Sequence, residues 1–296
     1  MGEPRGRAPK NLPQRVERAG VERGTVAVWY LGGAGLILKT PGAIVYVDPY
    51  TGAGDDDPAL GGRGVPVPFD PGAAGRVDAV LCTHDHTDHT DRETLSVWRH
   101  HLVPPVFGPA SSTDLAREWG YPADRLTALG HGDTATVADV RITAVRAYDP
   151  LAKGANGYLV EAQGVRLLHM GDSLYFPGLR EAVGRPVDAL YVSVGHNPPG
   201  KTFYMTEADA ARAARDVGAR TLVPVHWDLW PSFSLDPRRV GVVARWYCPS
   251  VSVRVPRYGR KMVLAAASSP ARPAAPSSGR GSGGAGVIPA RYGARC

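Results

Sequence analysis

Four side chains that can bind metal ions lie within six residues of one another, in a segment that reads THDHTDH over residues 83–89. They are His84, His86, Asp88 and His89. Imidazole nitrogens favour zinc and the transition metals near it, and carboxylate oxygens add the character of a hard ligand. In an extended chain His84 and His86 point to the same side, and a turn after them lets Asp88 and His89 form a second set. The segment therefore predicts the start of two metal sites, against the alternative of a polar loop whose histidines are solvated.

An apolar run precedes this segment, and several similar runs predict the strands that would position it. Strands are expected over residues 25–31, 36–39, 43–48, 77–83, 140–147, 157–162, 165–170, 189–194 and 221–225, with a hairpin turn at Gln163-Gly164. Helices are expected over 92–101, 112–119 and 206–217, the last with Thr206 as N-cap and Asp209 three residues further on. Polar residues gather where the strands end, which is typical of a sheet sandwich with a site on its rim.

The spacing His-x-His-x-Asp-His resembles the signature of the metallo-β-lactamase superfamily. This resemblance implies an α+β fold, an αββα sandwich of that type, with a dinuclear metal site on one edge of the sheets. It covers roughly residues 25–258 and implies a role for three more residues. Asp48 would support the histidine segment, Asp172 would bridge the two metals, and His226 would bind the second metal.

Within that superfamily the chain is similar to the L-ascorbate-6-phosphate lactonase family. The strings that carry the similarity are VWYLG at 28–32, DAVLCTHDH at 78–86, NPPG at 197–200 followed by Met205-Thr206, and HWDLW at 226–230. The chain departs from that family in a shorter, Gly-, Pro- and Asp-rich stretch at 50–76, in a shorter region after Tyr148, and at its C-terminal end. Since those regions would contact the substrate, the resemblance implies the chemistry rather than the substrate.

Asp149 stands where the superfamily usually supplies a third histidine to the first metal, at the end of the strand expected over 140–147. The lactonase family also has an aspartate here, so the resemblance implies that Asp149 is a metal ligand. The alternative is an Asp-Pro turn that caps the strand. An aspartate in place of a histidine would make the site richer in oxygen and shift its preference from zinc toward manganese. We therefore expect two divalent metal ions, zinc or manganese, as cofactors.

Three further residues are candidates for the surroundings of the metals. His196 would contact the substrate, with a surface histidine as the alternative. Asn197 would donate to a developing oxyanion, or would instead fix the turn that it begins. Asp228, two residues after His226, would orient that ligand from behind, as Asp48 would for the histidine segment.

The two ends of the chain hold its excess positive charge. The formal net charge is +6, of which residues 1–23 contribute +3 and residues 265–296 contribute +4, so residues 24–264 carry −1. We interpret 1–23 as a polar N-terminal arm, 24–264 as a hydrolase domain, and 265–296 as a disordered low-complexity tail. A nearly neutral body argues against a nucleic-acid partner, and we expect a small-molecule substrate.

The sequence also argues against a membrane partner and against secretion. No run approaches the ~20 apolar residues of a membrane span, and the polar first residues lack the apolar core of a secretory signal. The three cysteines, Cys82, Cys248 and Cys296, are odd in number and have no metal-motif spacing. These features predict a cytoplasmic protein in a reducing compartment, with the oligomeric state open and a homo-oligomer allowed.

Two metals held by these residues would lower the pKa of a shared water toward neutrality. The resulting hydroxide would attack a carbonyl or phosphoryl group, with Asp172 and Asp88 as the catalytic carboxylates. The leading hypothesis is a metal-dependent hydrolase that opens a lactone or related ester of a small polar or phosphorylated metabolite. Two alternatives stay open: a phosphodiesterase of the same fold, and a non-catalytic scaffold that binds metal.

Overall fold

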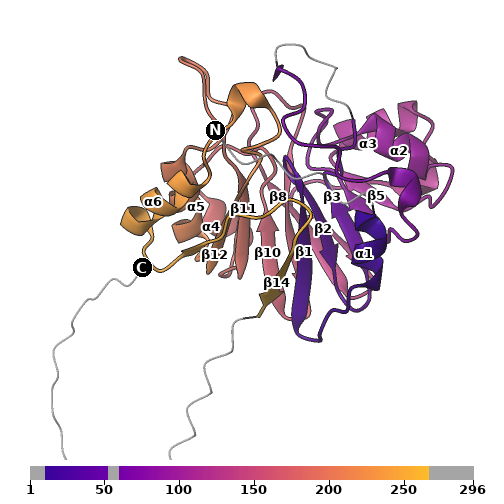
Figure 1. The fold of residues 1–296 in the computed structure, drawn as a ribbon, viewed down its shortest axis with the longest axis horizontal. Helices are drawn as coiled ribbons and strands as arrows, with labels where there is room; N and C mark the ends of the chain where they lie inside the picture. The colour runs from indigo at the N-terminus through magenta and orange to yellow at the C-terminus, as the bar shows by residue number, and fades with distance from the viewer. Residues whose placement is uncertain (1–10, 53–59, 267–296) are drawn as a thin grey trace, which may run out of the picture.

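Two mixed β-sheets of seven strands each make up the body of the protein (Figure 1). The computed structural model describes residues 11–52 and 60–266. In spatial order the first sheet contains β14 (Lys261–Ala265), β1 (Thr25–Gly32), β2 (Gly35–Lys39), β3 (Ile44–Val47), β4 (Ala79–Leu81), β5 (Val106–Gly108) and β6 (Leu126–Ala128). The second contains β13 (Ser252–Val253), β12 (Thr221–Val225), β11 (Ala189–Ser193), β10 (Val165–His169), β9 (Asn156–Ala162), β8 (Val140–Arg146) and β7 (Thr134–Val137). Within the described ranges no helix is long and apolar enough to cross a membrane.

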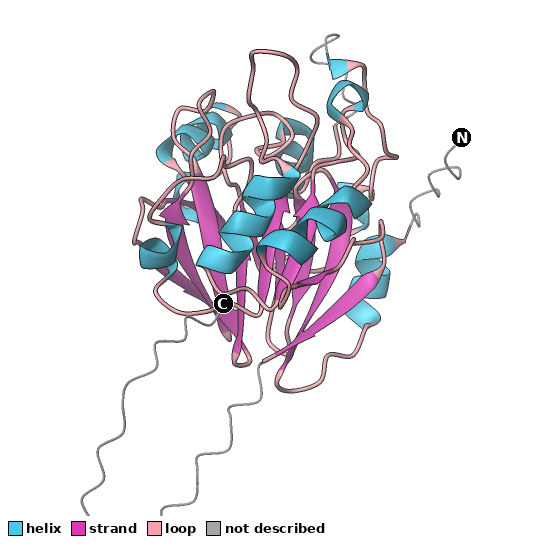
Figure 2. Cartoon of the chain, turned by 90° about the vertical axis from the view of Figure 1, so that its left-hand side faces the viewer, coloured by secondary structure: helices cyan, strands magenta, loops and turns pink. Residues whose placement is uncertain are grey.

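Helices cover the outer face of each sheet, so the layers run helix, sheet, sheet, helix (Figures 1 and 2). The first sheet carries α1 (Leu12–Arg18), α2 (Arg92–Trp98) and α3 (Ala110–Glu118), and the second carries α4 (Leu179–Val183), α5 (Glu207–Asp216) and α6 (Arg238–Tyr247). Between the sheets lies a core of buried side chains that includes Leu36, Leu81, Ile142 and Tyr191. This arrangement confirms the αββα sandwich.

Most of the longer elements lie where the sequence predicts them. The capping box of α5 is present, since the hydroxyl of Thr206 accepts a hydrogen bond from the backbone N–H of Asp209 at 3.1 Å. The hairpin turn at Gln163-Gly164 has both residues at positive φ, 54° and 79°. The prediction lacks α1, α4, α6, β5, β6, β7, β13 and β14. Six of these eight have five residues or fewer, which is too short for a periodic pattern to stand out.

The N-terminal arm expected over residues 1–23 includes a helix that belongs to the core. Leu12 and Val16 of α1 are fully buried against the outer face of the first sheet. The ammonium group of Lys39 donates to the carbonyl oxygens of Val16 and Glu17 at 2.8 and 2.6 Å, which joins the helix to β2. The polar arm expected over residues 1–23 therefore contains a helix with a buried side at residues 12–18, because two apolar residues four apart can give even so short a helix a buried side. Residues 1–10 lie outside the described residues.

The other expected boundaries fall partly on residues that the structure does not describe. The tail predicted over 265–296 lies outside the described residues from 267 onward, and Ala265 is the last residue of β14. Of the Gly-, Pro- and Asp-rich stretch at 50–76, residues 53–59 are likewise outside the described residues. The described part folds against the site, since Val65 packs with Tyr50, Leu229 and Trp230.

The chain leaves several strands at the same edge of the sandwich. β3 and β4 are parallel neighbours in the first sheet, and β10, β11 and β12 are parallel neighbours in the second. β8 also runs in the direction of β10, because both are antiparallel to β9 between them. The loops that follow these strands therefore gather at one edge, where Figure 2 shows long loops above the strands.

We predict that Leu12→Ala lowers the free energy of unfolding by about 2–5 kcal/mol, because it removes a fully buried side chain and leaves a cavity. Urea unfolding monitored by circular dichroism measures this. Arg15→Ala is the matched control: it changes an exposed side chain of the same helix, and we expect a change within about 0.5 kcal/mol. Equal effects of the two variants would show that α1 does not contribute to the core.

Candidate metal centre

Asp48 fixes the histidine segment to the first sheet. It follows β3, is fully buried and has a left-handed backbone with φ of 44°. Its Oδ1 accepts a hydrogen bond from the backbone N–H of Thr83, and its Oδ2 accepts one from the Thr83 hydroxyl, both at 2.8 Å. The same Oδ2 lies 2.8 Å from Nδ1 of His89, which leaves Nε2 of that ring turned the other way. The structure thus places Asp48 behind the segment, where a carboxylate can orient a ligand histidine.

The first cluster consists of His84, His86 and Asp149. Nε2 of His84 lies 2.9 Å from Nδ1 of His86 and 3.4 Å from Oδ2 of Asp149. Nδ1 of His86 lies 3.6 Å from the same oxygen, and its side chain is 36% exposed, so this cluster opens to solvent. Oδ1 of Asp149 accepts a hydrogen bond from the Leu151 N–H at 2.9 Å. The ligand and turn interpretations of Asp149 are therefore compatible, since one oxygen caps the turn and the other faces the histidines.

Asp88, His89 and His226 form the second cluster, and Asp172 lies within reach of both. Nε2 of His226 lies 3.0 Å from Oδ2 of Asp88 and 3.4 Å from Oδ2 of Asp172. Nε2 of His89 lies 3.7 Å from the Asp88 oxygen and 3.4 Å from the Asp172 oxygen. Asp172 also groups with His84 and His89. It therefore occupies the position of a carboxylate between two metal sites.

The spacing of these donor atoms fits metal coordination. Bonds from a divalent transition metal to nitrogen or oxygen measure about 2.0–2.2 Å, so neighbouring ligand atoms around one ion stand roughly 2.8–3.6 Å apart, from octahedral to tetrahedral geometry. The separations within the two clusters, from 2.9 to 3.7 Å, are close to that spacing. Oδ1 of Asp172 is buried and has no hydrogen-bond partner among the described residues, and a bound cation would relieve that state. The residues therefore fit divalent ions, and their mixed nitrogen and oxygen donors suit zinc as well as manganese.

Carboxylates and imidazoles in the two clusters stabilise one another's charge. Burial, aided by the neighbouring His89, lowers the pKa of His84, so this imidazole is neutral and able to bind a metal. Burial opposes charge on His89 and His226 as well, but Asp172 and Asp88 raise the pKa of both rings. Burial would raise the pKa of Asp88, but His89 and His226 hold it below its usual value. A divalent ion can replace the protons on these rings, so metal binding should release protons and weaken as the pH falls.

Trp230 holds Asp88, a role that the sequence did not reveal. Its indole N–H donates to Oδ2 of Asp88 at 2.9 Å, and its ring packs 6.0 Å from that of Tyr50. In the sequence nothing links Trp230, the last residue of the string HWDLW, to Asp88. The reason is that the partners are 142 residues apart, and no local pattern links them.

Asp228 supports His226 through the backbone instead of through the imidazole ring. Its Oδ1 accepts hydrogen bonds from the hydroxyl of Tyr30 at 2.7 Å and from the backbone N–H of Gly33 at 3.1 Å. The carbonyl oxygen of Gly33 in turn accepts a hydrogen bond from the backbone N–H of His226 at 2.8 Å. His226 has a φ of 65°, a strained conformation for a residue with a side chain. The expected outer carboxylate is thus present, and it acts through the turn at Gly33.

His169 and Gly171 place Asp172, although no sequence pattern marks either residue. His169 is fully buried at the end of β10, and its Nε2 lies 2.8 Å from the carbonyl oxygen of Ala34. Its Nδ1 accepts a hydrogen bond from the backbone N–H of Gly171 at 3.1 Å. Gly171 has a φ of 57°, and a Cβ atom there would lie 2.8 Å from the Thr83 side chain. The loop that carries Asp172 therefore depends on a glycine at position 171, which packs against Thr83, the residue that Asp48 holds.

The two residues expected to contact the substrate, His196 and Asn197, have different surroundings in the structure. Asn197 uses its amide within its own loop: Oδ1 accepts from the backbone N–H groups of Phe203 and Tyr204 at 2.7 and 3.0 Å, and Nδ2 donates to the Tyr204 carbonyl oxygen at 2.9 Å. Of its two expected roles, this supports the turn. His196 is exposed, and among the described residues its side chain makes no hydrogen bond. Tyr204 instead approaches the metal clusters, since its ring centre lies 5.0 Å from that of His226.

Comparisons with known proteins show the family of this chain. Residues 44–227 match a family described as the beta-lactamase superfamily domain. A protein of Salmonella choleraesuis named probable L-ascorbate-6-phosphate lactonase UlaG is 31% identical over 277 aligned residues, which cover 78% of this chain and 78% of that protein. Among solved structures, an isothiocyanate hydrolase from Delia radicum gut bacteria has a TM-score of 0.65 and 18% identity, and covers 81% of this chain and 99% of its own. A possible metal-dependent hydrolase from Veillonella parvula has the same TM-score and coverage at 17% identity. At such low identity the solved structures are evidence of the fold alone.

We predict that the metal-loaded protein contains two divalent ions and that Asp149→Ala contains one, because the first cluster then keeps only two histidines. Inductively coupled plasma mass spectrometry after loading with manganese or zinc measures this. Asp149→His should restore the second equivalent and favour zinc, since imidazole is the softer ligand. Two retained ions in Asp149→Ala would show that Asp149 only caps its turn.

Trp230→Phe should weaken the affinity of the second cluster for metal by about 10- to 100-fold, because Asp88 loses the donor that orients it. Titration against a competing chromophoric chelator measures this affinity. Trp227→Phe is the matched control, since the indole nitrogen of Trp227 has no hydrogen-bond partner among the described residues. A similar loss in both variants would contradict the role of Trp230.

Proposed function

This chain belongs to the metallo-β-lactamase superfamily of hydrolases, and we propose that it opens a lactone or related ester of a small polar or phosphorylated metabolite. The observation that supports hydrolysis is the pair of metal-binding clusters joined by Asp172 at one edge of the sandwich. The support for a lactone is the identity of 31% to a protein named as a lactonase, shared over 78% of both chains. The nearly neutral body favours a small molecule over a nucleic acid.

Divalent ions bound at the two clusters would lower the pKa of a water molecule toward neutrality and so supply hydroxide at physiological pH. In the proposed reaction the attacking oxygen bonds to the carbonyl carbon, and the ring C–O bond then breaks. Asp172 accepts the proton of the attacking water and passes it to the departing alkoxide. Asp88, held by Trp230, keeps His226 in place on the other side.

Tyr204 is the proposed donor to the substrate carbonyl oxygen. Its ring is buried beside His226, and its hydroxyl makes no hydrogen bond among the described residues. Burial, together with Asp172, Asp88 and Asp149, raises the pKa of this hydroxyl well above its usual value, so it stays protonated and is able to donate. The three hydrogen bonds between the Asn197 amide and the backbone of residues 203–204 fix the loop that carries Tyr204.

A panel of substrates tests the proposed function. Sugar lactones with and without a phosphate group, simple aryl esters and bis(p-nitrophenyl) phosphate are incubated with the manganese- or zinc-loaded full chain. We expect turnover of lactones that Asp172→Asn abolishes. Faster hydrolysis of the phosphodiester would instead support a phosphodiesterase. No turnover of any substrate by a fully loaded protein would support a metal-binding scaffold.

We predict that Tyr204→Phe lowers kcat for the preferred lactone by roughly 10²-fold, the usual effect of removing one oxyanion donor. KM and metal content should change little, because the ring still packs against His226. Tyr175→Phe is the matched control: its hydroxyl bonds to Asp216 at 2.6 Å, between a loop and the end of α5, and kcat should be unchanged. An unchanged kcat in Tyr204→Phe would remove this tyrosine from the mechanism.

A further inference from the structure

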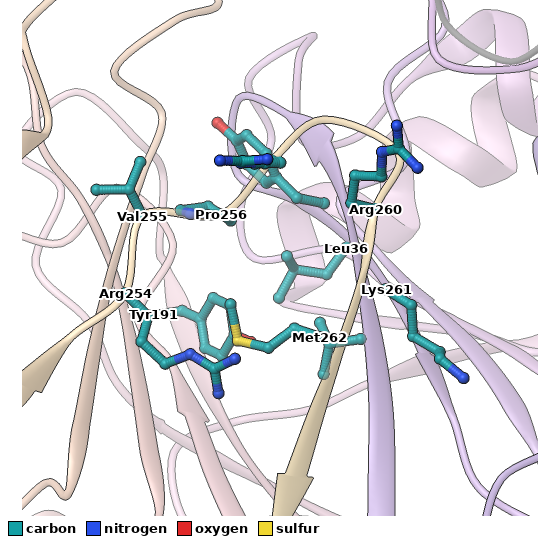
Figure 3. A pocket seen from close by; sticks show the side chains of 11 residues that line it. Leu36, Tyr191, Arg254, Val255, Pro256, Arg260, Lys261 and Met262 are labelled. Carbon is teal, nitrogen blue, oxygen red and sulfur yellow. The ribbon is translucent and has the colours of Figure 1, made fainter.

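A cavity of about 190 Å³ opens between the two sheets, and none of the residues of the metal clusters lines it (Figure 3). Leu36 and Tyr191 form part of its floor and are almost fully buried, and Met262 of β14 lies beside them. The hydroxyl of Tyr191 lies 3.7 Å from the Met262 sulfur. The sandwich is thus open at this side, and its inner apolar side chains line the opening.

Four cationic residues also line this cavity: Arg254, Arg257, Arg260 and Lys261. Figure 3 shows Arg254 on one side of the cavity and Arg260 and Lys261 on the other. All four are exposed, and among the described residues none of their side chains makes an ion pair or hydrogen bond. No acidic residue follows Asp236 in the sequence, so none lies near them along the chain on the C-terminal side.

Three other arginines of the same half of the molecule are paired. Arg220 lies 3.2 Å from Asp188, Arg238 lies 2.8 Å from Asp236, and Arg239 lies 2.8 Å from Glu207. The cavity therefore collects unpaired positive charge on a body whose net charge is nearly zero. Such a concentration of one sign attracts an anion over about 8–10 Å at physiological salt.

We propose that this cavity binds a small amphiphilic anion, a carboxylate or phosphate monoester with a short apolar tail. The tail would lie on Leu36 and Met262 between the sheets, and the anionic head would meet Arg254 and Arg257 at the mouth. Long arginine side chains without partners can turn onto such a head and bind it by two parallel hydrogen bonds. The volume is below the ~300 Å³ at which pockets for drug-sized ligands begin, so the ligand is small.

The proposal has a structural link to the metal centre. Tyr30 lines the cavity, and its hydroxyl donates to Asp228, which supports His226 through Gly33. Tyr30 thus belongs both to the wall of the cavity and to the hydrogen bonds that support His226. The binding site does not depend on the proposed function, since no residue of the clusters lines it.

Isothermal titration calorimetry with hexanoate and hexyl phosphate on the metal-loaded full chain tests the proposal. We expect saturable binding of at least one of them, weakened by added salt, and at least tenfold weaker binding of hexan-1-ol and of inorganic phosphate. Arg254→Gln/Arg257→Gln should weaken binding roughly tenfold, since an exposed ion pair contributes up to a factor of about five. Arg238→Gln/Arg239→Gln removes the same charge from paired arginines outside the cavity, and should leave binding unchanged.

Two further variants locate the bound anion. Met262→Trp should fill the cavity and abolish binding, with an unchanged circular dichroism spectrum as evidence that it folds. Asp172→Asn should keep binding, because it alters only the metal centre. No binding of either probe, equal binding by the two double variants, or loss of binding in Asp172→Asn alone would each overturn the proposal.

Discussion

The whole site depends on keeping buried charges of like sign close together. Asp88 and Asp172 lie within reach of the same two histidines, and Asp48 is fully buried behind one of them. Removing carboxylates from water costs several kcal/mol each unless hydrogen bonds or opposite charges compensate. Imidazoles supply part of that compensation, and divalent ions would supply more. The surrounding loops must therefore hold these carboxylates and imidazoles at ligand distance although the carboxylates repel one another.

Strained backbone at two strand ends follows from this constraint. Asp48 and His226 both have positive φ although neither is glycine, and each conformation costs on the order of 1–3 kcal/mol. Both are held by contacts that the strain makes possible: Asp48 by Thr83 and His89, and His226 by the carbonyl oxygen of Gly33. A more relaxed turn at either place would direct the side chain away from the cluster.

The sequence predicts the part of the site that is local in the chain. The histidine segment and the capping box of α5 lie within a few residues, so their spacing is readable, and the resemblance to a known superfamily supplies Asp149, Asp172 and His226. The roles of Trp230 and His169 could not be predicted in this way, because their partners, Asp88 and Ala34, lie 142 and 135 residues away in the sequence. α1 and the strands β13 and β14 could not be predicted from the sequence, because packing and strand pairing stabilise them and their own residue patterns do not.

Each metal cluster takes ligands from both sheets, and this gives the site a role in the fold. His84 and His86 follow β4 of the first sheet, while Asp149 follows β8 of the second. The second cluster likewise joins Asp88 and His89 to His226, which follows β12. An ion bound at either cluster would therefore link the sheets across the edge of the sandwich, and neither cluster can form until the sheets have packed. Metal affinity and sandwich stability must then be coupled, because an ion that binds only the closed arrangement stabilises it in proportion to the logarithm of its concentration.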